Sequence, residues 1–164
     1  MQSFDDYLLG LSSRMKRWGF SEFHHQPQDI DTPLCLHKRE FVATKFSIVD
    51  TFSVVMRAPL DCTPLNFETL SKRVFQFALD NKNRWPRGLG GGAVAYPVLV
   101  ADTLSGQLRS FAESYCPKHW ASIEFPVLVD LSSQSICHYA STPAWGAFYY
   151  EGLRNEARRL FWPE

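Results

Sequence analysis

The chain has 164 residues, enough for one ordinary domain, and 45% of them are hydrophobic, which excludes an intrinsically disordered protein. Seventeen basic residues balance seventeen acidic ones, so any attraction to nucleic acid must come from a local patch. The first residues lack the pattern of a secretion signal, and no apolar run is long enough to span a bilayer. With four cysteines that show no C-x-x-C spacing, we expect a cytoplasmic protein with reduced thiols and no membrane partner.

The N-terminal segment predicts a helix. Ser3 can cap it, apolar residues recur at helical spacing as far as Trp18, and Gly19 can end it in a left-handed conformation. The polar residues 24–36 that follow contain two prolines. They predict a short strand and a loop.

The next segment changes from helical to alternating periodicity. Apolar and polar residues alternate over residues 39–58, which predicts two strands joined near Asp50–Thr51, with one continuous bent strand as the alternative. A second helix is expected within residues 61–85, capped by Thr63 or Asn66.

The second half of the chain predicts three more strands and two helices. We expect a strand at residues 95–102, a short helix within 103–116, a strand at 123–131 and its hairpin partner at 135–140. The last helix is expected to start at Thr142–Pro143, since proline is favoured at the first helical position.

Two of these strands resemble each other. The segments "AYPVLVAD" and "EFPVLVDL" share an aromatic residue, proline, Val-Leu-Val and an acid, with Tyr96 and Phe125 in matching positions. Their separation suits a strand–helix–strand unit with parallel strands, and their continuous apolar character suits strands that are covered on both faces. Pro97 and Pro126 are expected near the start of each strand, where proline is tolerated.

The element order α-β-β-β-α-β-α-β-β-α predicts an α/β (or α+β) fold. We expect one three-layer domain over residues 1–164 with a mixed sheet. The order of the first six elements is similar to that of the restriction-endonuclease-like family, which implies nuclease chemistry. In that family an aspartate and an acid-x-lysine pair on adjacent strands hold a metal ion. The corresponding segments here read "SIVD" and "TFSVVMRA" and lack the second carboxylate, so the resemblance implies that cleavage is lost or relocated.

The glycine-rich stretch "RGLGGG" invites comparison with phosphate-binding loops. Such loops follow a strand and open a helix, so that backbone amides converge on the phosphate. Here the order is helix, glycines, strand, which excludes the dinucleotide-binding and Walker motifs. We predict a tight turn into the strand, with Gly88 and Gly90–Gly92 supplying the backbone freedom.

The segments before the two matching strands predict a binding surface. If the strands are parallel, "RWPRG" and "PKHW" lie on the same edge of the sheet, and the segment "STPAWG" also reaches that edge. We predict a surface there that binds anions or stacks on rings. Its members are Arg84, Trp85, Arg87, Lys118, His119, Trp120 and Trp145. In the alternative interpretation the basic residues complement helix C-termini and the tryptophans anchor loops.

Three aspartates are weaker candidates for catalysis. Asp102 and Asp130 each end a strand, at the edge where open α/β sheets bind ligands, and paired carboxylates there could hold Mg²⁺. Asp50 would join them in a nuclease-like site. Aspartates after strands also serve as ordinary turn and capping residues, which is the favoured interpretation.

A zinc site is also considered and set aside. Cys116, His119, Cys137 and His138 are suitable residue types, but neighbours on a strand point to opposite faces. We therefore expect no metal and no cofactor.

These patterns support three functional hypotheses. The leading one is a cytoplasmic non-catalytic binding or regulatory domain that takes an anionic ligand or nucleic acid at the basic, aromatic edge. The second is a metal-dependent enzyme acting on phosphodiesters or nucleotides through the three aspartates. The third is a homo-oligomeric interaction module that uses the aromatic last helix.

Overall fold

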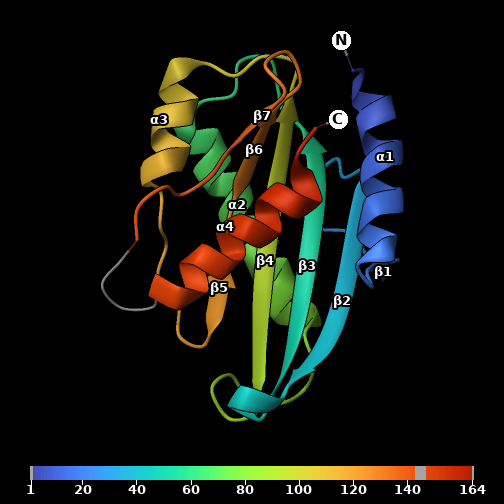
Figure 1. Ribbon diagram of the computed structural model, residues 1–164, viewed down its shortest axis with the longest axis vertical. Helices are drawn as coiled ribbons and strands as arrows, with labels where there is room; N and C mark the ends of the chain where they lie inside the picture. Colours follow the sequence, from blue (N-terminus) through green and yellow to red (C-terminus); the bar gives the residue numbers. More distant parts are fainter. Residues whose placement is uncertain (1, 143–146, 164) are drawn as a thin grey trace.

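The computed structural model describes residues 2–142 and 147–163 (Figure 1). In chain order they form α1 (Phe4–Arg17), β1 (Ser21–Glu22), β2 (Leu34–Val42), the 3₁₀ turn η1 (Ala43–Lys45), β3 (Ser47–Arg57), α2 (Pro64–Asn81), β4 (Gly91–Ala101), α3 (Gly106–Ser114), β5 (Ser122–Glu124), β6 (Val127–Asp130), β7 (Ser135–Cys137) and α4 (Ala147–Phe161). The predicted order and the mixed α/β class are confirmed, with one predicted strand divided into β5 and β6.

The strands form one mixed seven-stranded sheet. Its order is β1-β2-β3-β4-β6-β7, and β5 pairs with the first half of β4. The strands β3, β4, β5 and β6 run parallel, whereas β1, β2 and β7 pair antiparallel with their neighbours. The register places Ala95 opposite Glu124 and Val98 opposite Val127, so the parallel pairing of the two matching segments is confirmed.

Helices cover both faces of this sheet, which gives the three layers that the sequence predicts (Figure 1). On one face α1 and α4 pack over residues such as Tyr96 and Val98, and on the other α2 and α3 pack over residues such as Phe52 and Leu99. No helix within residues 2–142 and 147–163 has the length and apolar character to cross a bilayer.

Hydrogen bonds join α1 to the end of α4. The Tyr7 hydroxyl donates to the Phe161 carbonyl at 2.9 Å, and Arg14 donates to the carbonyls of Leu160 and Trp162 at 2.9 and 2.6 Å. These bonds satisfy carbonyl groups that the end of a helix leaves without intrahelical partners.

The helix starts agree in part with the predicted caps. Ser3 caps α1, and Thr63 caps α2 through a capping box with Asn66. The third helix, α3, lies within the predicted residues 103–116, and Ser105 caps it. The predicted start of the last helix at Pro143 lies outside the described residues.

Two strand predictions in the first half of the chain are wrong in position. The first strand lies at Ser21–Glu22, before the predicted range, where it pairs with Leu36 and His37. The connection between β2 and β3 lies at Ala43–Phe46, where Phe46 has a φ of 47°, whereas Asp50–Thr51 sits inside β3. Both segments compared with the nuclease pattern therefore belong to one strand.

Pro97 also departs from prediction, because it lies in the middle of β4 opposite Val54. The Ala95 carbonyl accepts a hydrogen bond from Phe125 N–H at 2.9 Å, so Ala95 and Pro97 direct their backbone polar groups toward β5 and β6. The missing N–H of Pro97 thus faces the interval between β5 and β6. A central strand accommodates proline here because its neighbour is interrupted.

Candidate functional site

Three loops meet at the amino end of the parallel strands, which is the lower end in Figure 1. They are the turn between β2 and β3, the glycine-rich loop between α2 and β4, and the loop between α3 and β5. Ile48 N–H donates to the Gly90 carbonyl at 2.8 Å, which joins the first two loops. A methyl group added to Gly88 would lie 2.9 Å from the Trp120 indole nitrogen, so the third loop packs directly on the second. The structure thus brings "RWPRG" and "PKHW" side by side.

Large apolar side chains are exposed on these loops and at the adjoining end of β2. We call this set the aromatic end; it consists of Phe41, Phe46, Trp85, Leu89 and Trp120, which are 62%, 84%, 59%, 74% and 76% exposed. The rings of Phe41 and Phe46 meet edge to face at 5.9 Å, and the Trp85 ring lies beside Gly90. Single exposed apolar residues are ordinary, but several large ones on adjoining loops mark an interaction surface.

The charge on the same loops has one sign. Residues 41–49, 82–94 and 115–123 contain no aspartate or glutamate, whereas Arg84, Arg87 and Lys118 lie exposed among them. Lys82 has a structural role, since its ammonium donates to the carbonyls of Asn83 and Trp85 at 2.9 and 2.5 Å. A chain without net charge therefore carries a local positive surface around the exposed rings.

Asp50 of β3 holds the start of the glycine-rich loop in place through hydrogen bonds. Its buried carboxylate accepts hydrogen bonds from His37 and Arg39 on one oxygen and from the backbone and side-chain amides of Asn83 on the other, all at 2.7 Å. Burial by itself would raise the pKa of Asp50, but the hydrogen bonds from His37, Asn83 and Arg39 outweigh it and hold the pKa well below its usual range. Asn83 in turn accepts from Trp85 N–H at 3.0 Å, so the carboxylate fixes the start of the loop.

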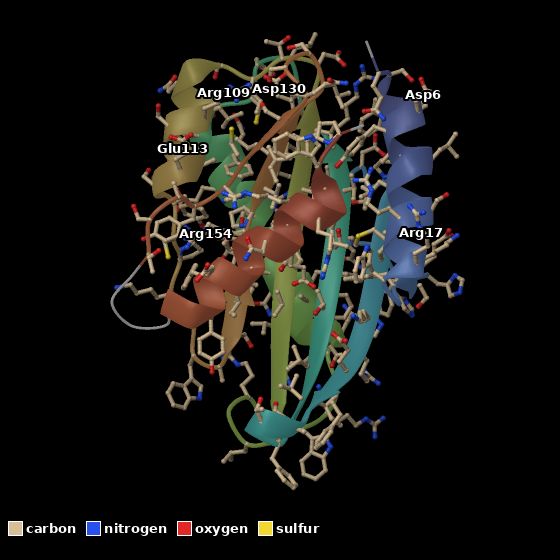
Figure 2. The ribbon with its side chains drawn as sticks, viewed as in Figure 1. Asp6, Arg17, Arg109, Glu113, Asp130 and Arg154 are labelled. Atoms are coloured by element: carbon tan, nitrogen blue, oxygen red, sulfur yellow. The ribbon has the colours of Figure 1, made fainter. Side chains whose placement is uncertain are left out.

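Asp102 and Asp130 lie at the opposite end of the sheet, away from Asp50. Asp102 is exposed and pairs with Arg57 at 3.3 Å. Asp130 is buried and pairs with Arg109, as Figure 2 shows at the upper end of the molecule. It also accepts from Leu104 N–H at 3.0 Å.

Asp130 serves the turn after β6. Its carboxylate accepts from the Ser133 N–H at 2.9 Å and the Ser132 hydroxyl at 2.8 Å. Burial would raise its pKa, but the hydrogen bonds from the Ser133 and Leu104 amides and from the nearby serine hydroxyls lower it to about 2. Both of its carboxylate oxygens therefore already accept hydrogen bonds, from the turn after β6 and from the segment that leads into α3.

The structure does not gather the three aspartates around one point. Among the residues it describes, no group of three or more histidine, cysteine, aspartate or glutamate side chains is placed to hold a metal ion. Within the zinc-like set, Cys116 Sγ lies 3.2 Å from the Tyr150 hydroxyl and Cys137 Sγ lies 3.2 Å from Arg109. The restriction-endonuclease-like order and the metal-dependent enzyme remain predictions from the sequence.

His119 belongs to a different environment from its neighbours Lys118 and Trp120. Its ring stacks on Phe75 of α2 with centroids 3.8 Å apart, and Nε2 lies 2.7 Å from a carboxylate oxygen of Glu124. The ring is thus held against the interior, whereas Trp120 and Lys118 are exposed.

Glu124 is a residue that the sequence interpretation missed. Its buried carboxylate also accepts from the hydroxyls of Ser71 at 2.5 Å and Tyr115 at 3.1 Å. Burial and the Glu124 charge raise the pKa of Tyr115 well above its ordinary value. An acid within the apolar run "IEFPVLV" was the available signal, because an acid in such a strand must find buried partners.

Trp145, the remaining predicted member of the surface, lies outside the described residues. Comparisons with protein-family models, curated proteins and solved structures found no match to this chain. Functional inference therefore rests on the geometry of the loops at the amino end of the sheet.

Proposed function

We propose that this chain is a non-catalytic binding domain that takes up single-stranded nucleic acid at the aromatic end. The observation that carries the proposal is the combination of exposed rings and basic residues on adjoining loops whose sequences contain no acidic residue. Proteins that bind single strands combine these two elements, because basic groups follow the phosphates while aromatic side chains stack with the bases.

The rings favour unpaired bases as the occupant. Four of the five members of the aromatic end are Phe or Trp. Stacking on an aromatic side chain contributes about 1–3 kcal/mol per base and tolerates any base, since every base has a flat face. In a duplex these faces are covered by neighbouring base pairs, so the loops would meet only the backbone and the groove edges.

The charges favour a phosphate backbone. Arg84 and Arg87 carry guanidinium groups, which can both pair with phosphate oxygens and stack on bases. Lys118 adds a third exposed basic side chain, and the sequences of the three loops contain no acidic residue. Because the chain has no net charge, the attraction is confined to this end and is sensitive to salt.

The stacking contribution is tested with Trp85→Ala and Trp120→Ala. Each variant is expected to weaken binding of a fluorescein-labelled oligothymidylate about five- to one-hundredfold, measured by fluorescence anisotropy, because each removes one stacking partner. Trp162→Ala is the matched control, since Trp162 is 46% exposed and belongs to none of the three loops. It should leave the affinity unchanged.

The charge contribution is tested with the salt dependence of the same titration. Three phosphate contacts predict that log K falls with log salt at a slope of about −2, and Arg84→Gln or Arg87→Gln should each reduce the slope by about 0.7. Arg17→Gln, which removes an exposed arginine on α1, should leave the slope unchanged.

Two outcomes would overturn the proposal. The first is binding to anionic vesicles, but not to the oligonucleotide, that depends on Trp85 and Trp120. The second is self-association that the same two substitutions abolish, observed by light scattering in the absence of oligonucleotide binding. Either result would assign the aromatic end to a lipid surface or to a second copy of the chain.

A further inference from the structure

A cavity of about 470 Å³ opens at the same end of the sheet, on the face that α4 covers. This volume falls within the usual range of small-molecule sites, which is about 300–1,000 Å³. The described residues that line it come from β3, β4, β5, α4 and the loops before β4 and β5. They are Ser47, Val49, Gly88, Gly90, Gly91, Gly92, Ala93, Val94, Pro117, His119, Ala121, Ser122, Ile123, Tyr149 and Tyr150.

One wall of the cavity is bare backbone. A methyl group added to Gly92 would lie 3.1 Å from the Ala121 carbonyl oxygen, and one added to Gly91 would collide with the carbonyl oxygen of Trp85. A side chain is therefore excluded at Gly91 and would be crowded at Gly92, so the glycine backbone itself forms this wall. Tyr149 and Tyr150 from α4 also line the cavity, so rings and peptide planes are the surfaces offered to a ligand.

His119 supplies a fixed polar group in the lining. Oε1 of Glu124 accepts hydrogen bonds from the hydroxyls of Ser71 and Tyr115, and Oε2 lies 2.7 Å from His119 Nε2. An ionised carboxylate has no proton to donate, so in this pair Nε2 is the donor. In the neutral ring Nδ1 is then an acceptor, and no described residue partners it. The stack on Phe75 holds the ring in this orientation.

We infer that this cavity binds a planar nitrogen heterocycle of nucleobase size, which lies against the glycine backbone and presents an N–H group to His119. The ligand has two possible sources, a free base or nucleoside and an unpaired base of a strand held at the aromatic end. The inference rests on the cavity and the Glu124–His119 pair, and it does not require that the chain binds strands.

The test uses free adenine, hypoxanthine and uracil as probes, with binding followed by saturation-transfer NMR and calorimetry of the full chain. Val94→Phe places a ring inside the cavity and should abolish binding. Ile136→Phe, an equivalent enlargement of a half-buried residue of β7 away from the cavity, should leave binding intact. His119→Gln keeps an amide that can donate to Glu124 but removes the ring acceptor, and it should weaken binding about tenfold.

The outcomes separate this inference from the proposed function. If none of the three bases binds to the wild-type chain, or if binding is unaffected by Val94→Phe, the inference is wrong whatever the oligonucleotide does. If the bases bind and Trp85→Ala with Trp120→Ala leaves them bound, the cavity is a site in its own right even when no strand binds. An oligonucleotide with abasic positions identifies the source. The loss of stacking at the aromatic end weakens its binding to the wild type and to Val94→Phe alike, whereas a strand base in the cavity predicts a larger loss for the wild type than for Val94→Phe.

Discussion

Asp50→Ala is expected to lower the free energy of unfolding by about 3–5 kcal/mol, which is the usual cost of removing one partner of a buried charge network. The substitution leaves His37, Arg39 and both amides of Asn83 without the acceptor that each contacts at 2.7 Å. Urea unfolding followed by circular dichroism measures the change. Asp50→Asn keeps the shape of the side chain, so it serves as the readout if the alanine variant does not fold.

Asp102→Ala is the matched control for this substitution. Asp102 is exposed and makes one long contact with Arg57, so its removal should cost less than about 1 kcal/mol. A cost at Asp50 no larger than that at Asp102 would contradict the role assigned to the buried carboxylate.

The same network predicts how stability depends on pH. The pKa of Asp50 is lower in the folded chain than in the unfolded one, so its contribution is complete above the unfolded pKa of about 3.9. The contribution is then lost as the pH falls from there through the lower folded pKa. The stability difference between wild type and Asp50→Asn should therefore be smaller at pH 3 than at pH 7, measured by urea unfolding at both values.

Glu124→Ala is the second substitution for which we expect a large effect. It leaves the buried hydroxyl of Ser71, the partly buried hydroxyl of Tyr115 and the Nε2–H of His119 without this acceptor. The loss of an acceptor costs about 1–3 kcal/mol for a buried donor. A total of about 3 kcal/mol or more is expected in thermal and urea unfolding. Glu124→Gln retains an oxygen acceptor and should recover part of the loss.

A spectroscopic readout distinguishes the positioning of His119 from a general loss of stability. In the wild type the proton should reside on Nε2, and Glu124→Gln should shift the tautomer balance seen in ¹⁵N NMR of the imidazole. Glu151→Ala, which removes an exposed glutamate of α4, should change neither the stability nor the tautomer. An unaltered imidazole spectrum in the Glu124 variants would show that the carboxylate does not orient the ring.

The parallel core of the sheet was predictable because its information is local. The matching segments around Tyr96 and Phe125 are apolar without interruption, and their spacing admits a helix between parallel strands. The neighbouring position of the loops before β4 and β5 was predictable from the same observation, since parallel strands place the segments that precede them at one edge of the sheet.

The predictions for Asp50–Thr51 and Pro97 were wrong because the local structure there depends on residues far away in the sequence. Asp50–Thr51 has the composition of a turn, but Asn83, 33 residues further along the chain, supplies the donors that let Asp50 lie inside a strand. Pro97 is tolerated in the middle of β4 because of an interruption between two other strands, β5 and β6. A sequence pattern that spans a few residues contains neither Asn83 nor the interruption between β5 and β6.

The link between α1 and the end of α4 constrains the order in which the chain can reach its folded state. The side chains of Tyr7 and Arg14 donate hydrogen bonds to the carbonyls of residues 160–162. These bonds, in the layer formed by α1 and α4, join residues that are 146 to 154 positions apart in the sequence. Contacts of such separation carry the largest loop-closure cost. The α2–α3 layer can assemble from segments already present when residue 137 has been synthesised, but the opposite layer must wait for almost the entire chain. The side chains of Tyr7, Leu11 and Met15 on α1 therefore reach their full burial only when α4 has joined the same core cluster.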